Sequence, residues 1–291
     1  MILRQKIALS FIHRAGGKAS RLQLVKWLFL LAQEGRSGQA SAYYQFVPYK
    51  FGPFSFTLYQ ELDALIRQGD LGAPTENDLE VTCSRSPLAH IDAPNVEREV
   101  EDLWERYGHL STKALVDTVY SHYPWFTLNC DQQDRRAGER TTAPCAVYTA
   151  GYEGLHVDGF LNLLLQTGIQ RLVDVRLNPV SRRYGFHKST LARLCRHLDI
   201  EYCHTPEVGI PAAWRKDLQT QGDYDRLFVR YVNEILPEQQ GVVDVISRWM
   251  KSGPSVLVCQ EAEPTRCHRS HLAKEIAGIS GLAINHLRRK N

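Results

Sequence analysis

The sequence of 291 residues lacks any apolar run close to twenty residues, the length that a membrane-spanning helix needs. It also lacks a signal-peptide core, because residues 1–6 lead into an amphipathic pattern without a small-residue cleavage site. The seven cysteines are an odd number and lack the spacing of a disulfide framework. Together these absences predict a cytoplasmic protein that makes no membrane contact.

A strong charge of one sign is also missing, because the formal net charge at pH 7 is only +3. The charges are nevertheless unevenly distributed. Lys and Arg exceed Asp and Glu by 9 to 4 in residues 1–72 and by 19 to 15 in residues 141–291, but are outnumbered 7 to 13 in between. A basic excess over a short segment suits phosphate backbones and is also typical of a solvated face. The first 72 residues therefore predict contact with DNA or docking onto another protein.

The N-terminal part predicts a mostly helical, winged-helix-like domain over residues 1–130. Helical patterns cover residues 2–12 and 20–31, with Gly16-Gly17 between them and Ser20 placed to cap the second. The turn Tyr49-Lys-Phe-Gly-Pro-Phe-Ser55 opens a third helix and resembles a turn in antitoxin-associated helical domains. A wing-like hairpin is expected at residues 69–82, followed by charged helices. Residues 131–145 lack an apolar period and predict a linker.

Residues 146–291 alternate short apolar runs with helical patterns. Four strands, each followed by a polar loop, are expected at residues 146–150, 171–175, 200–204 and 256–259. A fifth strand is expected at residues 282–287. A strand, a helix and a strand within about thirty residues describe a βαβ unit, hence parallel strands. The predicted fold class is therefore α/β, with a mainly parallel sheet. We expect Gly151, Arg176, His204 and Cys259, which each follow a strand, to share one edge of that sheet.

Several motifs of this half follow one another over residues 146–287: Thr149-Ala-Gly-Tyr-Glu-Gly154, Asp174-Val-Arg176, Asn178-Pro179, Ser181-Arg182, Gly185-Phe186, Tyr202 with His204-Thr-Pro-Glu207, Cys259-Gln-Glu261 and Cys267-His-Arg269. These motifs, in this order, resemble the domain-of-unknown-function family numbered 488. One departure is Val208-Gly209-Ile210, where the family usually continues with Leu-Gly-Gly. The resemblance implies a Rossmann-like, three-layer α/β fold with a polar site at the strand ends. It does not indicate which reaction, if any, the site performs, because the family has no settled chemistry.

The loop after the fourth strand collects reactive side chains just before Ser270, which is placed to cap a helix. Open α/β sheets bind ligands at the carboxyl ends of their strands, where helix N-termini favour anions. The candidate catalytic residues are groups that can move protons or attack a substrate there: Glu153, Glu261, Cys267 and His268. The candidate substrate-binding residues offer guanidinium, aromatic or imidazole groups to a phosphate and a base: Tyr152, Arg176, Arg182, Arg183, Tyr184, His204 and Arg269.

Some of these candidate residues also have a purely structural interpretation. Cys267 is either a thiolate favoured by the helix N-terminus or apolar filler between helix and sheet. Arg176 either grips a phosphate or pairs with Asp174 or Glu261. A metal site built from Cys259, Cys267, His268 and His204 is disfavoured, because seven residues between the thiols are not a zinc-knuckle spacing. No metal and no particular cofactor is therefore predicted.

Two classes of function remain open. The first is a nucleic-acid-associated protein whose α/β domain binds or processes a phosphate-bearing substrate, a nucleotide or DNA. The second is a non-catalytic DNA-binding or defence-related regulator whose α/β domain senses a ligand. A rhodanese-like thiol enzyme is a lesser variant of the first, since Asp174-Val-Arg176 and a thiol after a later strand resemble that pattern. Against it, a rhodanese thiol directly follows its strand, whereas Cys267 lies eight residues beyond Cys259. A Cys-x5-Arg phosphatase is excluded, because Arg269 is two residues past Cys267.

Overall fold

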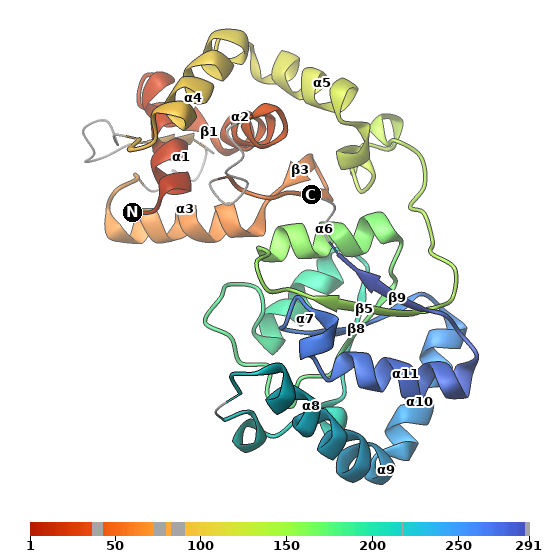
Figure 1. The fold of residues 1–291 in the computed structure, drawn as a ribbon. Coiled ribbons are helices and arrows are strands. Elements are labelled where there is room, and N and C mark those ends of the chain that lie inside the picture. Colours follow the sequence, from red (N-terminus) through yellow and green to blue (C-terminus); the bar gives the residue numbers. More distant parts are fainter. Residues whose placement is uncertain (37–42, 73–79, 83–90, 217, 289–291) are drawn as a thin grey trace. The chain divides into compact units, whose positions relative to one another are not determined.

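The computed structural model of the chain describes residues 1–36, 43–72, 80–82, 91–216 and 218–288. Its contacts divide the chain into two compact units, Met1–Glu139 and Arg140–Asn291, and we consider each by itself (Figure 1). The division falls within residues 131–145, the segment in which we expect the linker. In the described parts of the chain, every helix is too short or too polar to cross a membrane.

The first unit is mostly helical, as the sequence predicts. Its principal helices within the described residues are α1 (Leu3–Arg14), α2 (Arg21–Glu34), α3 (Phe56–Gln68), α4 (Pro94–Tyr107) and α5 (Thr112–His122), followed by the short turns η1 (Pro124–Thr127) and η2 (Gln133–Arg135). The core forms around α2, in which residues 24–31 are all buried. A helix buried all round is expected where neighbouring helices cover every face.

The helix starts of this unit follow the local sequence signals. The side chains of Ser20, Ser55 and Ser111 each accept a hydrogen bond from the backbone N–H three residues on, at 3.2–3.3 Å. Such a cap satisfies an N–H that has no partner within the helix. Gly16 and Gly17 have φ angles of 80° and 84°, a left-handed conformation that glycine adopts without steric cost. The predicted break after the first helix and the predicted cap of the second are confirmed.

Two short antiparallel ladders complete the first unit. The turn at residues 49–55 is a hairpin of β2 (Val47–Tyr49) and β3 (Gly52–Phe54). The strand expected near residue 80 is β4 (Glu80–Thr82), which pairs with β1 (Lys18–Ser20), between α1 and α2. The sequence does not predict this pairing, because it joins segments about sixty residues apart. The rest of the expected wing, residues 73–79, lies outside the described residues.

The second unit contains a five-stranded sheet in which every pairing is parallel, and this confirms the predicted α/β class. The strand order is β7-β6-β8-β5-β9. The strands are β5 (Val147–Gly151), β6 (Arg171–Asp174), β7 (Glu201–His204), β8 (Ser255–Cys259) and β9 (Ile284–Leu287). All of β8 is buried, as is typical of a central strand of a parallel sheet covered on both faces.

Helices cover both faces of this sheet and make the three layers (Figure 1). One face carries α6 (Val157–Thr167) and α7 (Lys188–His197), and the other carries α10 (Gln240–Ser252) and α11 (Arg269–Ser280). Alternate strand residues point to opposite faces, so Leu257 packs in the core with α10 and α11. Gly168 terminates α6 with a φ of 84°, the left-handed conformation common at helix C-termini.

The carboxyl ends of the strands lie along one edge, as we expect from the sequence. Gly151 is in register with Cys259, and Asp174 is in register with both His204 and Val258. From the adjacent strands β6 and β8 the chain leaves in opposite directions, toward β7 and β9 respectively. Such a divergence opens a crevice at the carboxyl edge, where ligands bind in open α/β sheets.

The described residues between 210 and 252 include helices that no sequence pattern predicts. The turns η3 (Pro206–Val208) and η4 (Ala212–Arg215) lead into a long helical stretch made of α8 (Gln221–Arg230), the π-helical turn η5 (Tyr231–Ile235), α9 (Leu236–Glu238) and α10. Pro237 has no N–H to donate to the carbonyl four residues earlier, which accounts for the wider π turn. The π turn carries Tyr231, which is buried at the edge of the sheet described above.

Candidate functional site

A buried ion pair lies at the end of β6. The Arg176 guanidinium donates to Asp174 through Nε to Oδ1 at 2.8 Å and through Nη2 to Oδ2 at 2.6 Å. Its Nη1 donates to the Tyr152 hydroxyl at 2.8 Å and to the Phe186 carbonyl at 3.0 Å. These contacts use four of the five N–H donors of Arg176, which is 7% exposed. The geometry matches the alternative in which Arg176 pairs with Asp174, and it leaves this side chain little capacity to hold a phosphate.

Aromatic side chains enclose this ion pair. The Tyr152 ring stacks on Phe186 with centroids 4.0 Å apart. The Tyr202 hydroxyl donates to Asp174 Oδ2 at 2.7 Å. Burial, and then the adjacent Asp174 carboxylate, raise the pKa of Tyr202, so that this hydroxyl keeps its proton. Tyr152, which we consider a residue for stacking on a base, is itself 3% exposed and packed inside the domain.

The other arginine expected at the strand ends, Arg269, is also buried, at 1% exposure. Its Nη1 donates to the carbonyl of Glu261 at 2.5 Å and its Nη2 to that of Ala262 at 2.9 Å, so it holds the loop after β8. The expectation that Ser270 caps the following helix is wrong. Helix α11 begins at Arg269 with His268 at the N-cap, and the Ser270 hydroxyl donates to the Pro264 carbonyl.

The same loop brings two thiols, an imidazole and a carboxylate together. His268 Nδ1 lies 3.8 Å from Cys259 Sγ and 4.0 Å from Cys267 Sγ, and the two sulfurs lie within 4.8 Å of each other. All three residues are buried, and Glu261 Oε2 accepts from Cys259 Sγ at 3.0 Å. Two sulfurs and an imidazole nitrogen are donors that can hold a metal ion. His204, a fourth residue considered for such a site, is engaged elsewhere.

Burial decides the protonation of these groups. Burial, and then the neighbouring Cys259, raise the pKa of Cys267 well above its usual value, so the free thiol is protonated at neutral pH. This opposes the interpretation of Cys267 as a thiolate nucleophile. Burial alone would raise the pKa of Glu261, but hydrogen bonds, first that from Cys259, outweigh burial and lower it. Glu261 is therefore an ionised carboxylate.

A cavity of about 220 Å³ opens beside this cluster. Glu261, Cys267 and His268 form one side of its lining. The remaining lining residues come from the loop after β7, from α8 and its approach, and from the loop after β8: Ile210, Arg215, Leu218, Tyr224, Leu227, Phe228 and Arg266. Arg215 and Arg266 are exposed, whereas Cys267 and His268 are buried, so two guanidiniums lie at the rim and the thiol and imidazole at the floor.

The other candidate residues lie on exposed loops at the same edge. Glu153 is exposed, and its carboxylate accepts from the N–H of Ala262 at 3.0 Å, so it braces the loop after β8 outside the cavity lining. Arg182 and Arg183 are exposed after β6, and Tyr184 beside them is half-buried. Arg183 Nη2 donates to the Leu155 carbonyl at 2.5 Å.

His204, at the end of β7, bridges two neighbouring segments. Its Nδ1 lies 2.8 Å from Lys188 Nζ, and its Nε2 lies 2.9 Å from the Arg176 carbonyl. A carbonyl only accepts and an ammonium only donates, so Nε2 carries the proton and Nδ1 the lone pair. Both nitrogens are used within the fold, so the structure gives His204 a positioning role at this edge.

Arg215, Tyr224 and Arg266 line the cavity and were not among the residues singled out from the sequence. Arg266 directly precedes Cys267, so its place in the reactive loop was a signal for it. Arg215 and Tyr224 lie in a segment without a sequence motif, and only the packing of α8 against the loop after β8 brings them to the site. The Arg266 guanidinium lies 5.8 Å from the Tyr224 ring centroid, so the two can cover a ligand together.

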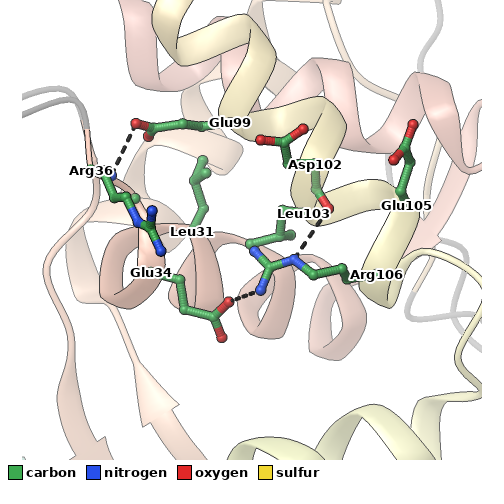
Figure 2. Close-up of a pocket in the computed structure, with 9 residues that line it drawn as sticks. Leu31, Glu34, Arg36, Glu99, Asp102, Leu103, Glu105 and Arg106 are labelled. Atoms are coloured by element: carbon green, nitrogen blue, oxygen red, sulfur yellow. Dashed lines mark hydrogen bonds and ion pairs between the residues drawn. The ribbon is translucent and has the colours of Figure 1, made fainter.

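The first unit has a hollow of its own, of about 670 Å³, between α2 and α4 (Figure 2). Four carboxylates and two arginines line it: Glu34, Glu99, Asp102, Glu105, Arg36 and Arg106. Arg106 donates to Glu34 at 2.5 Å, and the Arg36 N–H donates to Glu99 at 2.9 Å. This excess of negative charge repels phosphate, so the candidate site is the cavity of the α/β unit.

Comparison with known proteins bears on the second unit. The family model described as "Domain of unknown function DUF488" matches residues 156–276. No curated protein and no solved structure gives a significant match to the chain. The match begins after β5 and ends within α11, so it contains the Asp174–Arg176 pair, the two-thiol cluster and every residue that lines the cavity.

Proposed function

Starting from a chain whose C-terminal half contains a DUF488 domain, we propose that this protein associates with nucleic acid and binds a phosphate-bearing ligand of the nucleotide class at the carboxyl edge of its parallel sheet. The observation that carries the proposal is the cavity beside β8, with Arg215 and Arg266 at its rim and Glu261 and His268 below them. Guanidinium groups suit phosphate oxygens, and a nearby ring such as Tyr224 suits a base.

The distribution of charge between the two units supports this location. Residues 140–291 contain 20 Lys and Arg against 15 Asp and Glu, whereas residues 1–139 contain 15 against 17. The basic excess of the first 72 residues is partly offset within its own unit, where Lys6 pairs with Asp92 and Arg14 with Glu101. The α/β unit therefore carries the positive charge that favours an anionic ligand.

The proposal is one of binding. A nucleophilic-sulfur mechanism of the rhodanese kind needs a thiolate, and Cys267 is a buried thiol whose pKa burial raises. Two of the four arginines expected to hold phosphate are engaged within the fold: Arg176 bonds Asp174, and Arg269 holds the loop after β8. We therefore assign contact with the phosphate to Arg215 and Arg266.

The test is a titration of the full chain with mononucleotides and with a short single-stranded DNA, at two salt concentrations. Arg215→Ala and Arg266→Ala should each weaken binding by about 1.5–3 kcal/mol, the worth of a charge-assisted hydrogen bond. Arg248→Ala removes an exposed arginine of α10 outside the cavity lining and is the matched control. DNA affinity should also fall as salt is added, because bound cations are released from the phosphates.

Two results would overturn this function. The first is the failure of every nucleotide and of DNA to bind the wild-type chain at low salt. The second is an equal loss of binding in the Arg248 control and the two rim variants, which would show that general positive charge, and not the cavity, holds the ligand.

A further inference from the structure

The floor of the cavity has the geometry of a metal site. Cys259 Sγ, Cys267 Sγ and His268 Nδ1 lie within 4.8 Å of one another, and the two sulfur–nitrogen distances are 3.8 and 4.0 Å. Tetrahedral zinc with Zn–S near 2.3 Å and Zn–N near 2.0 Å separates its ligand atoms by roughly 3.5–3.8 Å. The two sulfur–nitrogen distances are therefore within a few tenths of an ångström of those that one zinc ion would impose.

The imidazole is oriented as a ligand. His268 Nε2 lies 3.1 Å from the Val175 carbonyl, which can only accept, so Nε2 carries the engaged proton, and in the neutral imidazole the Nδ1 lone pair faces the sulfurs. Metal-binding histidines commonly donate their second N–H to a backbone carbonyl in this way. Val175 directly follows β6, so the neighbouring strand holds the ring in place.

The loop between the two thiols is held at residues 261 and 262 by two contacts. Arg269 bonds to the carbonyls of Glu261 and Ala262. At the other side Gly151 packs so closely that a Cβ on it would lie 1.8 Å from the Glu261 carbonyl oxygen. A rigid loop keeps ligand atoms together before a metal arrives, which lowers the cost of binding.

Cys259 Sγ donates to Glu261 at 3.0 Å, but the contacts of both thiols with the imidazole are poor as hydrogen bonds. The thiol–imidazole distances of 3.8 and 4.0 Å are long for sulfur, and buried polar groups ordinarily obtain stronger partners. Two thiolates and an imidazole bound to a cation would satisfy all three side chains at once. Soft sulfur donors with an imidazole select zinc over magnesium or calcium.

We propose that Cys259, Cys267 and His268 bind one zinc ion at the floor of the cavity. Binding converts both thiols to thiolates, and their two protons pass to solvent. Three protein ligands leave a fourth position, and Glu261, whose carboxylate lies 3.0 Å from Cys259 Sγ, is beside it. Because Cys267 and His268 line the cavity, the ion is reached from there.

This site does not depend on the nucleotide proposal, because metal is measured with no nucleotide present. The full chain is purified under reducing conditions, incubated with zinc, freed of excess metal and analysed by elemental mass spectrometry. One zinc ion per chain is expected. Replacement by cobalt(II) should give thiolate-to-cobalt charge-transfer absorption and the visible bands of a tetrahedral ion.

The wild-type chain also provides a test that needs no variant. Zinc should protect Cys259 and Cys267 from alkylation, as read by peptide mass spectrometry, and a chelator should remove that protection. The exposed Cys145 serves as the internal control and should react equally in both states.

Variants then assign the ligands. Cys259→Ser, Cys267→Ser and His268→Gln should each lower zinc affinity by more than the roughly 10–100-fold that loss of an outer-shell partner costs. Cys195→Ala, a buried cysteine of α7 outside the cluster, is the matched control and should retain the metal. Three results would each overturn the site. The first is absence of zinc from the reduced wild-type chain, and the second is full retention of zinc by the double variant with Cys259→Ser and Cys267→Ser. The third is a disulfide between the two thiols in the freshly isolated protein.

Discussion

The buried pair of Asp174 and Arg176 gives the sharpest prediction for stability. Asp174 is 0% exposed, and apart from Arg176 its side chain has the Tyr202 hydroxyl as partner among the described residues. Arg176→Met keeps an apolar stem of similar length but leaves a buried carboxylate without its cation. We expect the free energy of unfolding of the α/β unit to fall by about 3–5 kcal/mol, the cost of breaking a buried pair from one side.

The size of this loss follows from the contacts that disappear. The variant removes both charge-assisted hydrogen bonds to Asp174, together with the donor to the Tyr152 hydroxyl and to the Phe186 carbonyl. Adding Asp174→Asn should restore part of the stability, because the uncompensated charge is then gone. We expect a coupling energy of about 1–3 kcal/mol between the two positions in a double-mutant cycle.

Hydrogen exchange in increasing urea, followed on peptides that cover β6 and β8, measures this loss in the unit concerned. Arg182→Met, an exposed arginine on the loop after β6, is the control and should change stability by no more than about 0.5 kcal/mol. If Arg176→Met is as stable as the wild type and instead loses nucleotide binding, the pair is not structural and Arg176 belongs to the ligand site.

Two further predictions concern Lys26 and Gly151. Burial lowers the pKa of Lys26 from 10.5 to about 7, so between these values the unfolded chain binds a proton that the folded chain lacks, and stability rises with pH. Lys26→Met should abolish this rise, on the order of a few kcal/mol between pH 7 and 10, in urea unfolding at several pH values. Gly151→Ala should cost about 1–3 kcal/mol or more and speed hydrogen exchange in residues 260–268, because its Cβ would meet the Glu261 carbonyl at 1.8 Å.

Each has its own control. For Lys26, the quantity to compare is the difference between variant and wild type at each pH, and a constant difference would contradict the lowered pKa. For the glycine, Gly278→Ala in α11 adds a methyl group to open space and should be neutral or stabilising. Equal stability of the two alanine variants would contradict the close approach at Gly151.

The local sequence determined much of the fold. Apolar runs placed the parallel strands, because a central strand covered on both faces must be apolar along its whole length, whereas no pattern marked α8, α9 or α10. Ser20 before an apolar run marked one helix start, since a cap depends on the residue at that position. The same apolar pattern predicted that the carboxyl ends of the strands share one edge of the sheet. It therefore also predicted that the motif residues that follow the strands lie close together.

Tertiary structure alone decided what those residues do. A sequence shows that Arg176 and Arg269 follow strands, but whether a guanidinium meets a phosphate or a buried carboxylate depends on partners such as Tyr152, which lies on another strand's loop. The thiols at 259 and 267 lack a zinc-knuckle spacing, yet a turn of the loop brings them to one imidazole. Arg215, in the turn η4, lines the cavity although no motif marks its segment. Local patterns encode backbone conformation, whereas the chemistry of this site arises from contacts between segments distant in the chain.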